Sequence, residues 1–355
     1  MKSLSKKSVI IIIVAVIVAA AIVAVSVIDA VYQSRNKAVT HTTIAMGSVV
    51  SQTIYGGSQD VCLSVSQAVA ELDEERLSAT SLVSEITQIN KNAGIAPVTV
   101  SDETLSYIIA GIEISDKTNG AFNICMGALI DLWDIGGQNP RVPTQQEIDV
   151  ALSLCDYTQI HIDGNNVFLA QSGMKIHFGA IGKGAGCDIA VDTIKQNEDV
   201  AGAVVSVGGS VATYGENPKS DVWTVGIRDP KGGVNDRLGL LKINGEAYIS
   251  TSGSYEKYFE QDGRKYHHIL DYSTGTPAQT ELLGVTVIAP SGFLSDALST
   301  ACFVLDVQTA LGVLEYYDCQ AIFVFENGDV TLTNGVAENF GLESESYRIA
   351  QVYGG

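Results

Sequence analysis

Basic residues are scarce in this chain. Its 355 residues include 21 Lys and Arg against 40 Asp and Glu, which gives a formal charge of −19. Proteins that bind nucleic acids need Lys and Arg to neutralise phosphates, so this balance argues against a nucleic-acid partner. Any other polyanionic ligand would need a metal ion or a local basic spot to bind here.

Cysteine motifs, repeats and linkers are also missing. The six cysteines contain no Cys-x-x-Cys pair, which excludes zinc-finger and thioredoxin-type sites. Short strand-like runs are mixed irregularly with helical stretches such as 59–92 and 102–118. We therefore expect an α+β fold, with one mixed domain over residues 43–355.

A long apolar run lies near the N-terminus. Three lysines precede an uncharged stretch from Val9 to Ile28 that only Ser26 interrupts. A helix of this length, at ~1.5 Å per residue, crosses a ~30 Å hydrocarbon layer. No small-x-small cleavage site follows it. We expect a transmembrane signal anchor over 1–30, a juxtamembrane segment over 31–42, and a domain held outside the cell membrane by this span.

One glycine-rich stretch, GAIGKGAGCD (179–188), precedes a helix-like segment. It is not a P-loop, because no Ser or Thr follows Lys183, and it is not a Gly-x-Gly-x-x-Gly turn. Its glycines would allow the backbone to approach a phosphate at a helix N-terminus. A tight turn from strand to helix explains the same residues.

The segment PSGFLSDALSTACFVLD (290–306) has an apolar stripe at helical spacing. Asp296 and Thr300 are four residues apart, so they share one face of that helix, away from the stripe. A carboxylate and a hydroxyl placed this way can hold a hard cation through oxygen. The alternative is a solvated helix face.

Two adjacent histidines occur in YHHILDYSTGTPAQ (266–279). The glycine and proline that follow are typical of a turn after a strand. Histidine is also the side chain that titrates nearest neutral pH, so a catalytic role is open for this pair.

Taken in order, these stretches resemble the ApbE family, the FAD:protein FMN transferases. The resemblance runs through most of the chain after the apolar run. The similar segments are AMGSVVSQTIYG (45–56), SEITQINKNAG (84–94), GAFNICMGALIDLWDIG (120–136), FGAIGKGAGCD (178–188), VSVGG (205–209), WTVGIRDP (223–230), ISTSGSYEKYF (249–259), YHHILDYSTGTPA (266–278) and VTVIAPSGFLSDALSTACFVL (285–305).

The resemblance implies a reaction and a catalytic site. The family transfers the FMN half of FAD to a Thr or Ser hydroxyl of a target protein and releases AMP. His268 matches the family's catalytic histidine and would accept the proton of the attacking hydroxyl. Mg²⁺ would be held by the backbone carbonyl of Ala180 and by the side chains of Asp296 and Thr300.

The resemblance also implies a set of FAD contacts. Core packing is the alternative role for the methionine and the phenylalanine of this set, and a surface position is the alternative for its lysine. The implied contacts are Met46, Ala121, Phe122, Asn123, Lys183, Asp188 and Ser252. Asn123 departs from the family pattern, which usually has Asp there, but the catalytic and metal positions are intact, so we expect an active enzyme.

The implied partner is an exported flavin-accepting protein, such as an electron-transfer subunit whose flavin is attached to a Thr. Three other functions fit parts of the sequence. Water could replace the acceptor hydroxyl, which would make the protein a Mg²⁺-dependent FAD pyrophosphatase. It could instead bind FAD at the membrane without turnover, or be a structural surface domain without flavin affinity.

Overall fold

The structure of the protein is a computed structural model that describes residues 17, 20–27, 29 and 33–354. Most of the expected anchor, namely residues 1–16, 18–19, 28 and 30, lies outside the described residues. Among the residues described, none of the helices has both the length and the apolar character needed to span a bilayer.

A nine-stranded sheet forms the centre of the fold, in the order β1-β2-β6-β7-β10-β15-β16-β17-β19. Neighbouring strands are antiparallel, except for the parallel pair β17 and β19. The strands are β1 (Ala38–Ala45), β2 (Ser48–Tyr55), β6 (Gly202–Val207), β7 (Ser210–Gly215), β10 (Ala247–Gly253), β15 (Leu282–Ala289), β16 (Gln320–Phe325), β17 (Asp329–Thr333) and β19 (Arg348–Tyr353). β1 therefore starts inside the range 31–42 that we assigned to a juxtamembrane segment.

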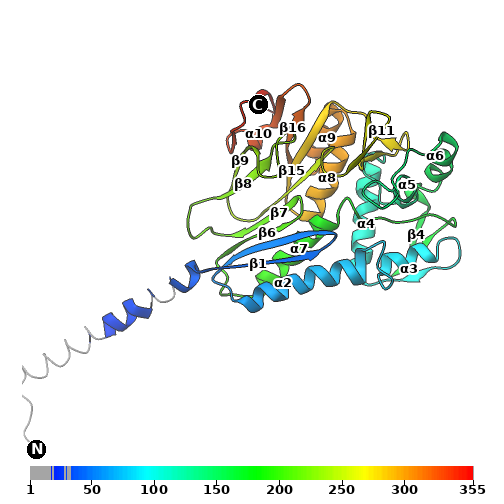
Figure 1. Cartoon of the computed structure of the whole chain (residues 1–355). Helices are drawn as coiled ribbons and strands as arrows, with labels where there is room; N and C mark the ends of the chain where they lie inside the picture. The colour runs from blue at the N-terminus through cyan, green and yellow to red at the C-terminus, as the bar shows by residue number, and fades with distance from the viewer. Residues whose placement is uncertain (1–16, 18–19, 28, 30–32, 355) are drawn as a thin grey trace, which may run out of the picture.

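Helices cover one face of this sheet. α2 packs on β1 and on α7, α7 packs on β6 and β7, and α8 packs on β10 and β15 (Figure 1). These helices, together with the neighbouring α9, are α2 (Gln59–Glu71), α7 (Gly182–Lys195), α8 (Gly292–Val304) and α9 (Val307–Tyr316). The other helical segments after β1 are the π-helix η1 (Leu72–Leu77), α3 (Glu85–Lys91), α4 (Asp102–Lys117), α5 (Gly127–Trp133), α6 (Gln145–Leu152), the 3-10 helix η2 (Tyr157–Gln159) and α10 (Asn334–Ala337).

A small sheet shares an apolar core with the other face. Side chains of β16 alternate between the two sides, because Phe323 lies in the core beneath the helices and Ile322 lies in the core with β8 and β9. The small sheet has the order β18-β9-β8. The minor strands are β8 (Trp223–Arg228), β9 (Arg237–Ile243), β18 (Phe340–Leu342), β3 (Val98–Thr99), β4 (Ile160–Asp163), β5 (Asn166–Leu169), β11 (Tyr258–Gln261), β12 (Arg264–His267), β13 (Leu270–Asp271) and β14 (Thr276–Pro277).

The expected mixed α+β fold is confirmed, but the continuous helix expected over 59–92 was wrong. The helical path ends at Leu77, because Ser78 has an extended backbone. The Ser78 hydroxyl accepts hydrogen bonds from the backbone N–H groups of Thr80 and Ser81. Serine side chains compete in this way with helical hydrogen bonds. Ser84 then caps a separate helix, α3.

Candidate active site

The site is built where the first turns of α7 and α8 cross. A Cβ on Gly184 would overlap the carbonyl oxygen of Gly292, and a Cβ on Gly292 would overlap the carbonyl oxygen of Gly184. Glycine at both positions therefore allows the two helix backbones to touch. Gly184 also donates its backbone N–H to Asp296 Oδ2 at 2.9 Å. The glycine-rich stretch thus begins a helix and fixes the carboxylate of the next one.

Asp188 holds the start of α8. Its two carboxylate oxygens accept the backbone N–H groups of Gly292 and Phe293 at 2.6 and 2.8 Å. A carboxylate is favourable at a helix N-terminus, although burial raises the pKa of Asp188 to about 6. Both oxygens of Asp188 are thus engaged within the protein, and the FAD contact that the resemblance implies for it stays a prediction.

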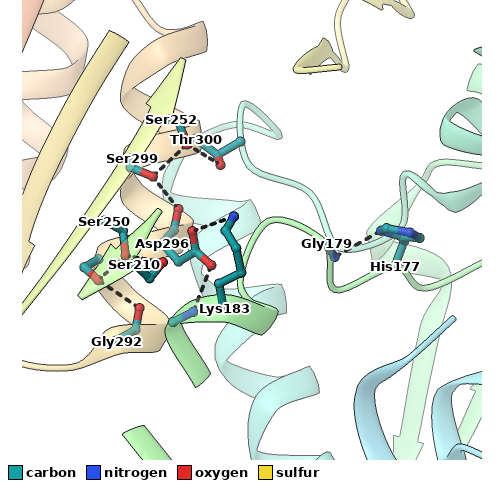
Figure 2. Close-up of polar contacts among 12 residues, drawn as sticks. His177, Gly179, Lys183, Ser210, Ser250, Ser252, Gly292, Asp296, Ser299 and Thr300 are labelled. Carbon is teal, nitrogen blue, oxygen red and sulfur yellow. Dashed lines mark hydrogen bonds and ion pairs between the residues drawn. The ribbon is translucent and has the colours of Figure 1, made fainter. Parts of the chain in front are cut away.

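Asp296 is buried, so the alternative of a solvated helix face was wrong. Only 1 % of the residue is exposed. Lys183 Nζ lies 3.6 Å from Asp296 Oδ1, while Oδ2 receives the Gly184 N–H (Figure 2). The Asp296 carboxylate raises the pKa of Lys183, so the lysine is charged at neutral pH. The ion pair therefore joins a buried carboxylate, Asp296, to a partly exposed lysine, Lys183, at the centre of the site.

Thr300 lies one helical turn beyond Asp296. Its hydroxyl is 3.2 Å from the hydroxyl of Ser252 on β10, and Ser252 is also 2.7 Å from Ser299 (Figure 2). Ser252, which the resemblance places against FAD, therefore contacts the helix that carries Asp296.

The oxygen atoms present suit a hard cation. Asp296 Oδ1 lies 3.6 Å from Lys183 Nζ, and Thr300 supplies a hydroxyl on the same side of α8. Ala180, in the turn before α7, is partly buried. Within the described residues, no group of three or more His, Cys, Asp or Glu side chains is placed to hold a metal. The expected set of one carboxylate, one hydroxyl and one carbonyl is of another kind and fits Mg²⁺.

His268 lies just after β12 with a defined ring orientation. The Lys257 carbonyl oxygen is 3.2 Å from His268 Nδ1 and 3.1 Å from the His268 backbone nitrogen. A carbonyl only accepts, so Nδ1 carries the proton and Nε2 keeps a lone pair. Burial, together with the charge of Lys183, lowers the pKa of His268 to about 4. The ring is therefore neutral at pH 7 and able to accept a proton at Nε2.

His267 points elsewhere and supports its neighbour. It is buried, its Nε2 lies 3.0 Å from the carbonyl oxygen of Ala278, and its ring packs edge-on against Phe303 of α8. Since a carbonyl is an acceptor, Nε2 of His267 is the protonated nitrogen. His267 thus ties the segment that holds His268 to the helix that carries Asp296.

Met46 reaches the same region from the tip of the β1–β2 hairpin. It has a left-handed backbone with φ of 54°, and its N–H donates to Asp73 at 2.7 Å. Its sulfur lies 2.8 Å from where a Cβ on Gly186 would stand, so it packs on α7.

The segment Ala121–Asn123 is held mainly by contacts within the protein. Phe122 is buried in the core, while Ala121 is partly exposed. The Asn123 side chain donates to the carbonyl of Cys155 at 2.8 Å and accepts the N–H of Cys125 at 2.7 Å. Both ends of this amide are used, so Asn123 acts here as a clamp between two backbone segments.

His177 is a residue of this region that the sequence interpretation missed. The ring Nδ1 of His177 accepts the backbone N–H of Gly179 at 3.0 Å (Figure 2). The backbone N–H of His177 donates to the carbonyl of Ile124. It therefore links the Ala121–Asn123 region to the turn that carries Ala180. A single histidine before a glycine-rich stretch gives no signal in the sequence that could have identified it.

His268 is a neutral histidine whose Nε2 has no hydrogen bond among the described residues, and the positive charge of Lys183, paired with the buried Asp296, acts on its ring. This arrangement is typical of a group-transfer enzyme rather than of a purely structural domain. Residues 46–323 match the model of the ApbE family. The chain belongs to the ApbE family.

Curated relatives cover most of the chain. A protein of Klebsiella pneumoniae named FAD:protein FMN transferase is 34% identical over 319 residues, which are 89% of this chain and 98% of that protein. A protein of Treponema pallidum with the same name is 34% identical over 278 residues, or 74% of this chain and 76% of that protein.

Solved structures share the fold. The ApbE protein of Thermotoga maritima superposes with a TM-score of 0.77 at 30% identity, covering 84% of this chain and 98% of that one. The flavinyl transferase ApbE of Pseudomonas stutzeri, in its apo form, superposes with a TM-score of 0.75 at 29% identity, covering 87% of this chain and 98% of that one.

Proposed function

We propose that this protein transfers FMN from FAD to a Ser or Thr hydroxyl of an exported acceptor protein and releases AMP. Membership of the ApbE family and the printed names of its relatives support this activity. The observation that carries the mechanism is the contact of His268 Nδ1 with the carbonyl oxygen of Lys257, because a hydrogen bond donated from Nδ1 leaves Nε2 as a base.

The acceptor hydroxyl attacks the phosphorus of the FMN phosphate. The new bond joins the acceptor oxygen to that phosphorus, and the bond that breaks is the pyrophosphate P–O bond to the AMP phosphate. His268 Nε2 takes the hydroxyl proton, and AMP leaves with the electron pair of the broken bond. A positioned base of this kind contributes about 10²- to 10⁴-fold to a rate.

Asp296, Thr300 and the carbonyl of Ala180 would hold Mg²⁺, which would neutralise charge on the pyrophosphate of bound FAD. Lys183 is the nearby cation that faces Asp296. In so acidic a protein, this lysine supplies the local positive charge that a dianionic substrate requires.

We also propose that residues 1–30 anchor the protein in the cell membrane, with the catalytic domain from residue 43 onward on the outer side. The support is in the sequence, where three lysines precede an apolar stretch long enough to span. An exported electron-transfer subunit would then meet the site outside the cytoplasm.

In-gel flavin fluorescence tests the activity. The full-length protein is incubated with FAD, Mg²⁺ and an acceptor protein that has no flavin yet and whose attachment site is a Thr, and the denatured acceptor is examined. A fluorescent acceptor band is expected, and EDTA or Asp296→Ala should abolish it. Release of FMN and AMP without a labelled acceptor would point instead to a pyrophosphatase, and unchanged bound FAD would point to storage.

A further inference from the structure

Two pairs of buried serines join β10 to α8. Ser250 and Ser252 are two residues apart on β10, so they share a face of the sheet, and Ser295 and Ser299 are four apart on α8, so they share a face of the helix. Ser250 lies 2.8 Å from Ser295, and Ser252 lies 2.7 Å from Ser299 (Figure 2). Of these two pairs, only the second, Ser252 with Ser299, continues to Thr300, whose hydroxyl is 3.2 Å from that of Ser252.

The direction of the hydrogen bonds in this second pair follows from one fixed acceptor, the backbone carbonyl of Asp296. The Ser299 hydroxyl lies 2.9 Å from the backbone carbonyl of Asp296 and donates to it. A hydroxyl has one proton, so Ser299 can only accept from Ser252. The proton of Ser252 is then used, so the contact between Ser252 and Thr300 needs the proton of Thr300. The relay therefore runs from Thr300 to Ser252, to Ser299, and to the Asp296 carbonyl.

We infer that Ser252 and Ser299 are positioning residues that turn the Thr300 proton away from the cation site, so that Thr300 presents its lone pairs to a divalent cation. A threonine hydroxyl binds a cation through oxygen, and a proton pointing at the cation would oppose binding. This inference rests on the proposed function, because it assumes that Thr300 and Asp296 hold the cation.

The first pair, Ser250 with Ser295, provides the matched control. Ser295 is buried like Ser299 and donates to a carbonyl three residues earlier, that of Gly292, at 2.9 Å. It also contacts a serine of β10. It has no hydrogen bond to Ser252 or Thr300 among the contacts of the described residues. Ser295→Ala therefore removes a buried serine hydroxyl from the same helix and leaves Ser252, Ser299 and Thr300 in place.

Mn²⁺ binding to the full-length protein tests the inference. Mn²⁺ accepts oxygen ligands as Mg²⁺ does, and electron paramagnetic resonance measures its free concentration. Loss of a group that orients a metal ligand typically weakens metal affinity by about 10- to 100-fold. We expect Ser252→Ala and Ser299→Ala each to raise the Kd for Mn²⁺ by about tenfold. We expect Ser295→Ala to stay near the wild-type value, and thermal unfolding to show that all three variants are folded.

The double variant Ser252→Ala with Ser299→Ala gives the sharper test. A relay is broken by the first substitution, so the double variant should bind Mn²⁺ no more weakly than either single variant. Additive losses, wild-type affinity in both single variants, or an equal loss in Ser295→Ala would overturn the inference. Asp296→Ala tests the proposed function separately. If that variant binds Mn²⁺ as the wild type does, the cation is held elsewhere, and both the proposed cation site and the relay are wrong.

Discussion

In the proposed mechanism the chemistry depends on His268, and the environment of this residue is unusual for a base. Burial and the charge of Lys183 favour the neutral ring and lower its pKa to about 4. In the proposed FAD complex, anionic phosphates would lie in the same region, and a nearby negative charge favours the protonated ring, which would raise the pKa of His268 again. The free enzyme and the FAD complex should therefore titrate differently.

pH–rate profiles check this directly. The ring must be neutral to accept a proton, so activity is lost as the pH falls through its pKa. We expect the acid limb of kcat/KM, which reports the free enzyme, to lie well below the ordinary histidine pKa of about 6.5. The acid limb of kcat should lie at higher pH. His268→Ala should remove both limbs, and a kcat/KM limb near 6.5 would contradict the account.

The hydrogen bonds of the Asn123 amide give a second prediction at the scale of single residues. Its amide donates to the Cys155 carbonyl, which a carboxylate cannot do, and the position is buried. Asn123→Asp restores the residue usual in the family but should lower the free energy of unfolding by about 1–3 kcal/mol at pH 7, because a charge is buried and a carbonyl loses its donor. Asn139→Asp, whose side chain is exposed, serves as the control in urea unfolding. Equal stability of the two variants would show that the clamp is unimportant.

At the scale of elements, the contact of α7 with α8 positions the site. Gly184→Ala should disrupt it, because the new Cβ would overlap the Gly292 carbonyl and approach Asp296 Cβ to 2.8 Å. Gly182 is in the same helix, and a Cβ there meets no atom within 4 Å. We expect Gly184→Ala to lose about 1–3 kcal/mol of stability and most Mn²⁺ affinity, since overpacking shifts both helices.

Gly182→Ala is the matched variant for this test. It should be neutral or more stable by up to about 1 kcal/mol, because alanine favours a helix over glycine. Thermal unfolding and Mn²⁺ titration of the two variants compare them. Similar behaviour of Gly182→Ala and Gly184→Ala would mean that the crossing of α7 and α8 does not control the site.

The spacing of residues in the sequence predicted where helices form better than it predicted which elements contact one another. The spacing of Asp296 and Thr300 placed them on one face of a helix, and α8 carries both. The stretch 102–118 was expected to be helical, and α4 occupies it. The break after Leu77 was missed, because serines compete with helical hydrogen bonds only in particular conformations.

Long-range contacts were beyond the sequence. Asp188 contacts α8 across 104 residues, and Ser252 contacts Thr300 across 48. No local pattern shows that a strand serine faces a helix hydroxyl. The resemblance to a family supplied candidate residues, but the roles of Asp188, Asn123 and His177 within the protein became visible only in the fold.

At the scale of the whole molecule, the proposed anchor sets where the reaction occurs. Cell fractionation should place the full-length chain in the membrane pellet, resistant to alkaline carbonate, because an apolar span of this length is retained by the bilayer. External protease should digest the domain in spheroplasts while a cytoplasmic control protein survives. Recovery in the soluble fraction, or protection from the protease, would contradict the proposed topology.

The most direct test of the central claim is the intact mass of the acceptor protein after incubation with the full-length enzyme, FAD and Mg²⁺. The account predicts that the acceptor gains the mass of one covalently attached FMN, with one AMP released for each flavin attached. His268→Ala should leave the acceptor unmodified although the variant still binds FAD. An acceptor labelled equally by the wild type and by His268→Ala would contradict the role of His268 as the base that activates the acceptor hydroxyl.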